Sequence, residues 1–338
     1  MNKRALGADG LLLLTAAIWG FGFVAQRSGM EYIGPFAYNG IRFVLGSISL
    51  FPIIAWQKHG TPLNLKKALP GILAAGSIIF FAVTLQQIGI MFTTAGNAGF
   101  ITGLYVVLTP VFGIFLGRKT GRATWIGAVF TLVGLYFISV ASSVTAEINP
   151  GDIIIALGAV FWAFHVLIID RLVQKTDPII LSSGQFMICG LYSLGVAFLA
   201  EPVLRTWLNS FDTLAAIAWT PFPALLSGLF SGIIPVTKVS GAIIPILYGG
   251  LASVGIAYTL QVVAQKNAPP AHATIILCLE GCFAALGGVI ILHEPLGPST
   301  VLGFALMLAG MLVSQWETIL KKEPRITRIF TDFHGLER

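Results

Sequence analysis

Residues 16–29 read AAIWGFGFVAQRSG, an apolar stretch that contains a single tryptophan, Trp19. A related stretch, AVFWAFHVLIID, occupies residues 159–170, and its Trp162 follows Trp19 by 143 positions. In both copies an aspartate precedes the tryptophan by ten positions. One apolar segment that recurs in the two halves of a chain indicates an internal repeat, and this repeat decides the fold.

A second offset relates later parts of the two copies. VTLQ at 83–86 matches YTLQ at 258–261, and Tyr105 matches Glu280, both at a spacing of 175. The difference between 175 and 143 means that the second copy carries 32 additional residues. We expect this insertion near 201–242, as an external segment that lies in the membrane interface.

The composition places the chain in a membrane. Of its 338 residues, 56% are hydrophobic and 10% are charged, and the mean hydropathy is +0.87. A soluble domain carries about 25% charged residues, so a soluble fold of this chain would expose a large apolar surface to water. The net charge of +6 does not indicate a nucleic-acid partner, because the basic residues gather in short loops.

A membrane-spanning helix needs about 20 mostly apolar residues to cross about 30 Å of hydrocarbon. Ten runs satisfy this requirement, and most gaps between them hold glycine, proline or charged residues. The predicted spans are 8–27, 35–56, 68–90, 94–116, 123–142, 152–171, 179–200, 243–264, 272–292 and 298–317.

The lysines and arginines predict the orientation of these spans. With the N-terminus in the cytoplasm, all 20 of them face the cytoplasm except Arg27, Arg42, Arg205 and Lys238. This bias predicts a multi-pass protein of the cell's inner or plasma membrane with both termini in the cytoplasm. The basic residues 321–338 then form a cytoplasmic tail.

The ten spans divide into two copies of five, over residues 1–145 and 146–320. Because five is odd, the two copies enter the membrane from opposite sides, which makes the repeat inverted. The predicted fold is therefore an all-α integral membrane protein with ten transmembrane helices in two inverted five-helix repeats. Inverted repeats are typical of secondary transporters, in which one half rocks against the other around a central site.

Several stretches are similar to signatures of the drug/metabolite transporter superfamily, in particular its EamA-type members. They are WGFGFV at 19–24, IRF at 41–43, GIAYTLQ at 255–261, LE at 279–280 and HEPL at 293–296. The resemblance covers about residues 8–317 and implies small-molecule transport. The family's solutes range from amino acids to nucleotide sugars, triose phosphates and lipid-linked molecules. Gly281 replaces the family's proline, and no subfamily's substrate carries over.

A charged side chain in the middle of a span costs about 2.5–3.5 kcal/mol on insertion scales. Glu280 lies within the ninth predicted span, so we expect it to face a wet cavity, where it binds a solute or carries a proton. The alternative is a hydrogen bond between helices. The indole N–H groups of the two related tryptophans are expected to reach the same cavity. The predicted substrate-pathway residues are Trp19, Asn97, Tyr105, Trp162, His165, His272 and Glu280.

Four further polar residues are expected to act as gates or as structural polar groups: Arg42, Gln86, Gln185 and Gln261. Arg42 either extends its side chain toward the membrane surface or binds a carbonyl, a carboxylate or an anionic solute. We expect a structural role for it first. Gln86 corresponds to Gln261 at the offset of 175, and Arg42 corresponds to Gln185 at 143.

The chain contains no HExxH, GxSxG, P-loop or CxxC sequence. We therefore expect no enzymatic activity, no cofactor and no bound metal. The predicted function is export or exchange of a small organic metabolite by alternating access, with membrane lipid and protons as further partners. Two alternatives stay open: a flippase for a lipid-linked amphipath, and a membrane-embedded enzyme that uses Glu280 and His272.

Overall fold

The computed structural model describes residues 3–57, 65–92, 95–139, 150–200, 236–292 and 297–320. Every regular element in these ranges is a helix. In chain order they are α1 (Lys3–Met30), α2 (Pro35–Ser49), α3 (Phe51–Gln57), α4 (Leu65–Gly89), α5 (Ala95–Thr102), α6 (Tyr105–Phe115), α7 (Arg122–Ser139), α8 (Pro150–Leu172), α9 (Pro178–Leu199), α12 (Val236–Leu247), η2 (Tyr248–Tyr258), α13 (Thr259–Gln265), α14 (Pro270–Leu277), α15 (Glu280–Leu292) and α16 (Pro298–Leu320).

Seven helical segments in the described ranges are long and apolar enough to span a membrane, from Leu6–Met30 to Pro270–Ile291. Three shorter apolar helices accompany them: Tyr105–Phe115, Arg122–Phe137 and Val301–Ser314. The outward faces carry large apolar side chains, among which Phe115 is 83% exposed and Ile244 is 77% exposed. Lipid accommodates such a surface and water does not, so the chain is a multi-pass membrane protein. The count of ten spans stays a prediction.

Several predicted spans are interrupted near their middle. The fourth consists of α5 and α6, which are separated at residues 103–104. The ninth consists of α14 and α15, which are separated at residues 278–279, exactly one offset of 175 later. In the eighth, the π-helix η2 joins α12 to α13. Irregular backbone is tolerated inside a membrane only where protein or a water-filled cavity covers its polar groups, so these interruptions indicate the interior.

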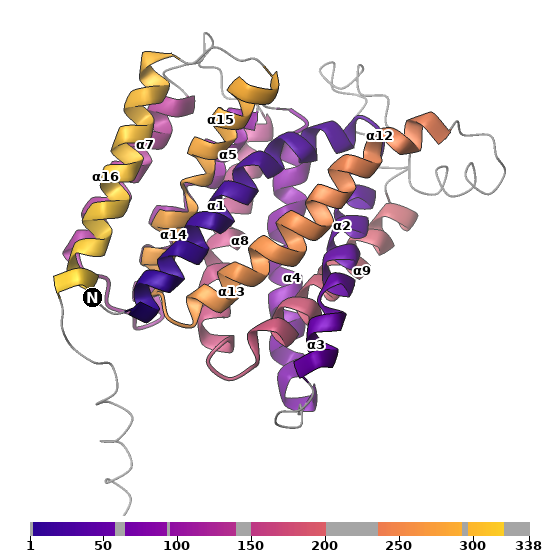
Figure 1. The fold of residues 1–338 in the computed structure, drawn as a ribbon, viewed down its shortest axis with the longest axis horizontal. Helices are drawn as coiled ribbons and strands as arrows, with labels where there is room; N and C mark the ends of the chain where they lie inside the picture. The colour runs from indigo at the N-terminus through magenta and orange to yellow at the C-terminus, as the bar shows by residue number, and fades with distance from the viewer. Residues whose placement is uncertain are drawn as a thin grey trace, which may run out of the picture.

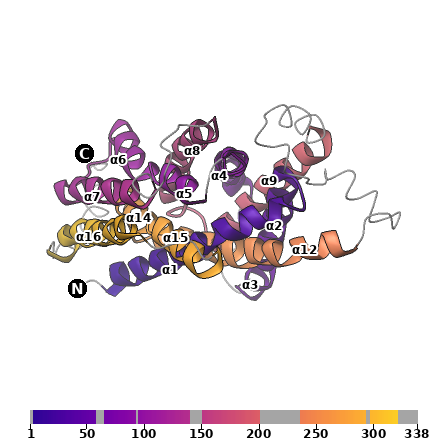
Figure 2. The ribbon, with the colours of Figure 1, turned by 90° about the horizontal axis from the view of Figure 1, so that it is seen from above.

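The two halves of the chain interlock. Figure 2 shows two layers, with α1, α12, α15 and α16 in one and α4, α5, α7 and α8 in the other. Helix α1 packs against η2, α13, α14 and α15, all from the second half, whereas α8 packs against α4, α5 and α6 from the first half. Contacts of α7 with α16 and of α2 with α9 join the halves further (Figure 1). The first helix of each half therefore packs among helices of the other half.

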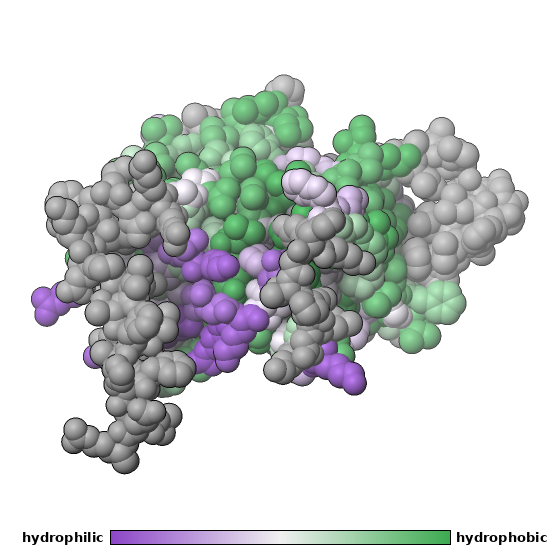
Figure 3. All heavy atoms as spheres, turned by 60° about the horizontal axis from the view of Figure 1, so that its bottom comes forward, coloured by the Kyte–Doolittle hydropathy of each residue, from purple (hydrophilic) through white to green (hydrophobic). Residues whose placement is uncertain are grey.

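One end of the molecule is hydrophilic. The N-terminal end of α1 and the turns after α8 and α13 lie at the bottom of Figure 1. Figure 3 turns this end forward and shows hydrophilic residues gathered between apolar flanks. The exposed basic residues of these turns are Arg171, Lys175 and Lys266. Charged turns beside apolar helices mark a level at which the helices leave the hydrocarbon.

Three predicted features fall wholly or largely outside the described residues. They are HEPL at 293–296, the basic tail at 321–338 and most of the insertion expected near 201–242. Within the insertion range the description resumes at Val236, where α12 begins. The placement of the insertion in the membrane interface therefore stays a prediction.

The contact between α7 and α16 depends on a glycine. A Cβ atom on Gly127 would lie 2.6 Å from the backbone oxygen of Gly310 and 2.9 Å from the Cβ of Ser314. Both distances are shorter than carbon atoms tolerate, so a larger residue at Gly127 would push the helices apart. Small residues that let backbones approach closely are the usual basis of helix association in membranes.

We predict that Gly127→Ala lowers the free energy of unfolding by about 1–3 kcal/mol, because it overpacks this contact. Gly10→Ala is the matched control, since a Cβ on Gly10 meets no atom within 4 Å. This control is expected to be neutral or to add up to about 1 kcal/mol through helix propensity. Reversible unfolding in mixed detergent micelles measures both changes. Equal effects of the two substitutions would show that the close approach has no energetic role.

Candidate functional site

A cavity is lined by helices of both layers. Ten of its 14 lining residues form five pairs at the sequence offsets of 143 or 175. The pairs are Trp19 and Trp162, Phe23 and Val166, Gln86 and Gln261, Thr102 and Leu277, and Tyr105 and Glu280. The other lining residues are Gln26, Arg42, Ser253 and Tyr258. Residues that correspond in the two copies of the repeat therefore line the same cavity.

Aromatic rings form much of the cavity wall. The ring centroids of Trp19 and Tyr258 lie 4.4 Å apart. Trp162 lies 5.9 Å from Tyr258, and the planes of these two rings meet at 16°. Phe43 and Phe186 complete the cluster, each at 5.8 Å from Tyr258. Such packed rings offer a flat apolar surface to a ligand and lose little side-chain entropy when one binds.

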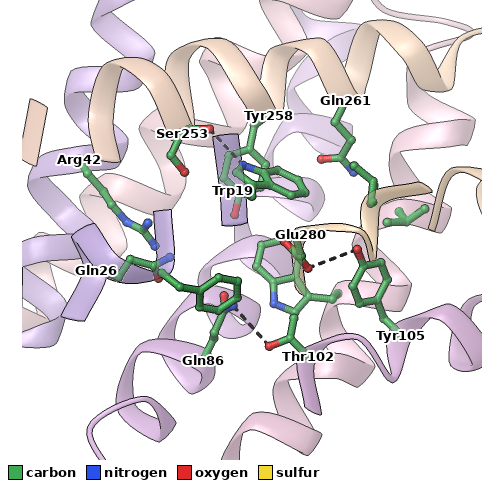
Figure 4. Close-up of a pocket in the computed structure, with 14 residues that line it drawn as sticks. Trp19, Gln26, Arg42, Gln86, Thr102, Tyr105, Ser253, Tyr258, Gln261 and Glu280 are labelled. Carbon is green, nitrogen blue, oxygen red and sulfur yellow. Dashed lines mark hydrogen bonds between the residues drawn. The ribbon is translucent and has the colours of Figure 1, made fainter. Parts of the chain in front are cut away.

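The two related tryptophans differ in the direction of the indole N–H. Trp19 Nε1 donates to the backbone oxygen of Ser253 at 3.3 Å (Figure 4). Trp162 Nε1 is buried and has no hydrogen-bond partner among the described residues. Both tryptophans line the same cavity, as expected, and the Trp19 N–H is bound there by the carbonyl of Ser253, another lining residue. Ser253 belongs to the π-helix η2.

The two helix breaks place a hydroxyl and an acid together. Tyr105 and Glu280 are the first residues of α6 and α15. Tyr105 Oη donates to Glu280 Oε1 at 3.5 Å (Figure 4). Cys278 Sγ donates to the backbone oxygen of Gly103 at 3.4 Å, so the breaks also touch each other. The first turn of a helix is a favourable place for an acid because the helix dipole is positive there.

Another part of the cavity is polar. In Figure 4 the guanidinium of Arg42 and the amide of Gln26 point toward one another, and Glu280 and Tyr105 lie farther along. Gln86 Nε2 donates to Thr102 Oγ1 at 3.4 Å. Arg42 is 2% exposed, so its side chain lines the cavity and does not extend to the membrane surface.

His165 and Gln185 lie outside the cavity lining. His165 Nε2 and Gln185 Oε1 are 2.9 Å apart, and both residues are fully buried. The ring centroids of His165 and Trp162 lie 5.9 Å apart, and the two ring planes are nearly perpendicular. His165 was expected on the pathway and Gln185 at a gate or as a structural polar group, and the structure places both outside the cavity lining. Polar groups in a membrane interior form such pairs because hydrocarbon offers them no other partner.

His272 also lies away from the cavity, in a polar cluster with residues of α1 and α16. Its Nε2 is 2.9 Å from Asp9 Oδ1, and its Nδ1 is 3.3 Å from Ser314 Oγ. Two further contacts lie at the same end of the molecule. Arg118 forms an ion pair with Asp170, and Gln174 Nε2 donates to the backbone oxygen of Lys266 at 3.2 Å. Together these contacts tie α1 to α14 and α16, the turn after α6 to α8, and the turn after α8 to the turn after α13.

Some lining residues carry a signal that our sequence prediction did not use. Gln26 follows Trp19 by seven positions and Phe23 by three, which places all three on one helix face. Thr102 precedes Tyr105 by three, although a helix break lies between them. Ser253 carries no such signal, because the π-helix changes the periodicity. Asn97 was predicted on the pathway; it belongs to α5, and its side chain is outside those described.

Comparison with known proteins gives two matches to one family model. The model of the EamA-like transporter family matches residues 6–140 and 149–315. The gap between the matches falls just before α8, where the second copy of the tryptophan segment begins.

Similar proteins are named as transporters. An uncharacterized transporter of Archaeoglobus fulgidus is 27% identical over 92% of this chain and 87% of its own length. The uncharacterized transporter YvbV of Bacillus subtilis is 25% identical over 94% of each chain. The uncharacterized inner membrane transporter YedA of Escherichia coli is 24% identical over 98% of each chain. One crystal structure aligns with a TM-score of 0.69 and 16% identity, over 93% of this chain and 99% of the other, which shows a shared fold.

We predict that the His165–Gln185 pair is a structural link. His165→Leu and Gln185→Leu each leave a buried polar group without a partner, so each is expected to destabilise the protein. The double variant recovers part of the loss, with a coupling energy of about 0.6 and up to about 1.7 kcal/mol. Unfolding of the four proteins in mixed micelles measures the coupling. A coupling near zero would reject the link.

Proposed function

Since the chain belongs to the EamA-like transporter family, we propose that it is a secondary transporter that moves a small organic metabolite across the cell membrane by alternating access. The observation that carries this proposal is the cavity at which the paired residues of the two halves meet. The net direction is export or exchange.

The proposed arrangement has ten spans in two inverted repeats, with both termini in the cytoplasm. The distribution of lysine and arginine supports this orientation. The exchange of first helices between the halves supports the repeat, because α1 and α8 occupy equivalent surroundings. In this arrangement the hydrophilic end that holds Asp9 and His272 faces the cytoplasm.

We assign the structure to a state that is closed toward the cytoplasm. At that end the Asp9–His272–Ser314 cluster and the Arg118–Asp170 ion pair join residues of the two halves, and the Gln174–Lys266 hydrogen bond joins the turns after α8 and α13. Rocking of one half against the other would break the two contacts between the halves and expose the cavity to the cytoplasm. Alternating access requires at least these two states, one closed toward the cytoplasm and one open toward it.

The enzyme alternative loses its support in this geometry. That alternative used Glu280 and His272 together, but His272 contacts Asp9 and Ser314 and does not line the cavity. Glu280 instead contacts Tyr105. In the proposed mechanism Glu280 carries a proton or binds the solute, and the aromatic wall holds the solute's apolar part.

We predict saturable flux of at least one solute when proteoliposomes are tested with a panel of metabolites, with and without an imposed pH gradient. If Glu280 carries the proton, Glu280→Gln abolishes the stimulation by the gradient and leaves solute exchange in place. Glutamine keeps the size of the side chain and an oxygen that accepts the hydrogen bond of Tyr105, but it does not ionise.

Arg27→Gln is the control for this experiment, because Arg27 is exposed and lies outside the cavity lining. Its flux is expected to equal that of the unaltered protein. Gradient-driven flux that survives in Glu280→Gln excludes Glu280 as the proton carrier. Absence of flux for the whole panel would falsify the transport proposal.

We predict that Asp9→Ala opens the cytoplasmic end. Loss of a hydrogen bond to a charged group costs about 1.5–3 kcal/mol, which shifts a two-state equilibrium about ten- to a hundredfold. The reporter is Thr102→Cys in a background that lacks Cys189, Cys278 and Cys282. Its labelling by an impermeant thiol reagent from the cytoplasmic side is expected to accelerate in the same proportion.

Asp9→Asn is the matched variant for this measurement, because asparagine retains an acceptor for His272 Nε2. Its labelling rate is expected to lie between those of Asp9→Ala and the unaltered protein. If Asp9→Ala labels no faster than the unaltered protein, the cluster does not close the cytoplasmic end.

A further inference from the structure

Arg42 is a buried cation whose partners are neutral. Its Nε donates to Asn39 Oδ1 at 3.0 Å. Its guanidinium carbon lies 5.3 Å from the ring centroid of Tyr38 and 5.1 Å from that of Phe43. Within the described part of the chain, its terminal nitrogens have no hydrogen-bond partner. Aromatic faces attract a cation only modestly, so these contacts leave the positive charge without a counterion.

None of the described carboxylates is a counterion for Arg42, because each has another partner or lies beyond ion-pair distance of the guanidinium. The ion pairs in the described ranges are Arg118–Asp170 and His272–Asp9. Among the described residues, Glu280 accepts a side-chain hydrogen bond from Tyr105, and no carboxylate oxygen of these residues lies within ion-pair distance of Arg42. A buried charge without a partner is expensive, and in membrane interiors it commonly faces a cavity that receives a ligand.

Unpartnered polar atoms accompany Arg42 in the same cavity. Gln26 Oε1, Trp162 Nε1 and Gln261 Oε1 are buried and have no hydrogen-bond partner among the described residues. All three residues line the cavity. Figure 4 shows Gln26 directed toward the guanidinium. A ligand with one charged head and one polar substituent would satisfy atoms that the protein leaves open.

We propose that Arg42 binds the carboxylate of the transported solute and that this solute is a small organic monoanion with an apolar or aromatic body. This inference rests on the transport function proposed above. A guanidinium presents paired N–H donors that match the two oxygens of a carboxylate. The clustered rings of Trp19, Trp162 and Tyr258 form the surface against which the body of the solute lies.

The charge balance favours a single negative charge. One guanidinium neutralises one carboxylate, whereas a phosphate ester with two charges would leave an excess negative charge in a site that also contains Glu280. A cation would meet Arg42 with repulsion. A neutral amide of the same shape would fill the same volume but would leave the guanidinium without a counterion.

The experiment measures binding to the purified full-length chain in detergent by isothermal titration calorimetry. The ligands are phenylacetate, its neutral analogue phenylacetamide, and phenyl phosphate. The expected result is that phenylacetate binds at least about tenfold more tightly than the amide, which corresponds to the gain of one charge-assisted interaction. Phenyl phosphate is expected to bind more weakly than phenylacetate.

Three variants assign this preference to Arg42. Arg42→Gln is expected to bring the ratio of the acetate and amide affinities to about one. Arg42→Lys keeps the charge without the planar fork, and its ratio should fall between the two. Arg27→Gln makes the same chemical change at an exposed position of α1, and its ratio should be unchanged. Thermal unfolding of each variant shows whether it is folded.

Four results would overturn the inference. They are an amide that binds as tightly as phenylacetate, no binding of either, phenyl phosphate as the tightest ligand, and a preference that survives in folded Arg42→Gln. If Arg42→Gln does not fold, the selectivity of the unaltered chain and of Arg42→Lys decides. Saturable flux of neutral or cationic solutes alone would overturn the anion assignment and leave the transport function standing.

Discussion

The structure depends on one constraint: a backbone N–H or C=O in hydrocarbon must have a partner inside the protein. The breaks after α5 and α14 satisfy it by meeting each other, because the Cys278 thiol donates to the carbonyl of Gly103. The π-helix η2 satisfies it by presenting the Ser253 carbonyl to the indole of Trp19. The irregular backbone of these two breaks and of η2 therefore lies beside the cavity, whose lining includes residues next to each of them.

The position of the cavity follows from the way in which the two copies of the repeat pack together. Each half places its first helix among helices of the other, so the paired residues of the two copies end up on facing walls. The pairs differ in chemistry, however. Tyr105 opposes Glu280 across the breaks, while the polar residues Gln26 and Arg42 have no polar counterpart in the lining. Because the residue types differ between the two copies, the two ends of the cavity differ in chemistry.

The sequence predicted a bundle of apolar helices and the convergence of residues related by the two offsets, because hydropathy and spacing are local properties. It located Trp19, Trp162, Tyr105 and Glu280, all of which line the cavity. It did not predict the helix breaks or η2, since these depend on partners from distant segments. For the same reason the direction of the Arg42 side chain stayed open and His165 was grouped with the pathway residues, because helix rotation is set by packing and not by composition.

The difference between Arg42 and its counterpart Gln185 has a kinetic consequence for the proposed carrier. At zero membrane potential and equal pH on both sides, detailed balance forbids the carrier from creating a gradient, so the ratio of maximal rate to half-saturating concentration must agree for both directions. The half-saturating concentrations themselves need not agree, because an asymmetric cavity stabilises its two empty orientations unequally. Such a carrier reaches half-saturation at different solute concentrations on the two sides of the membrane. At saturating solute it is therefore faster in one direction than in the other, without consuming energy.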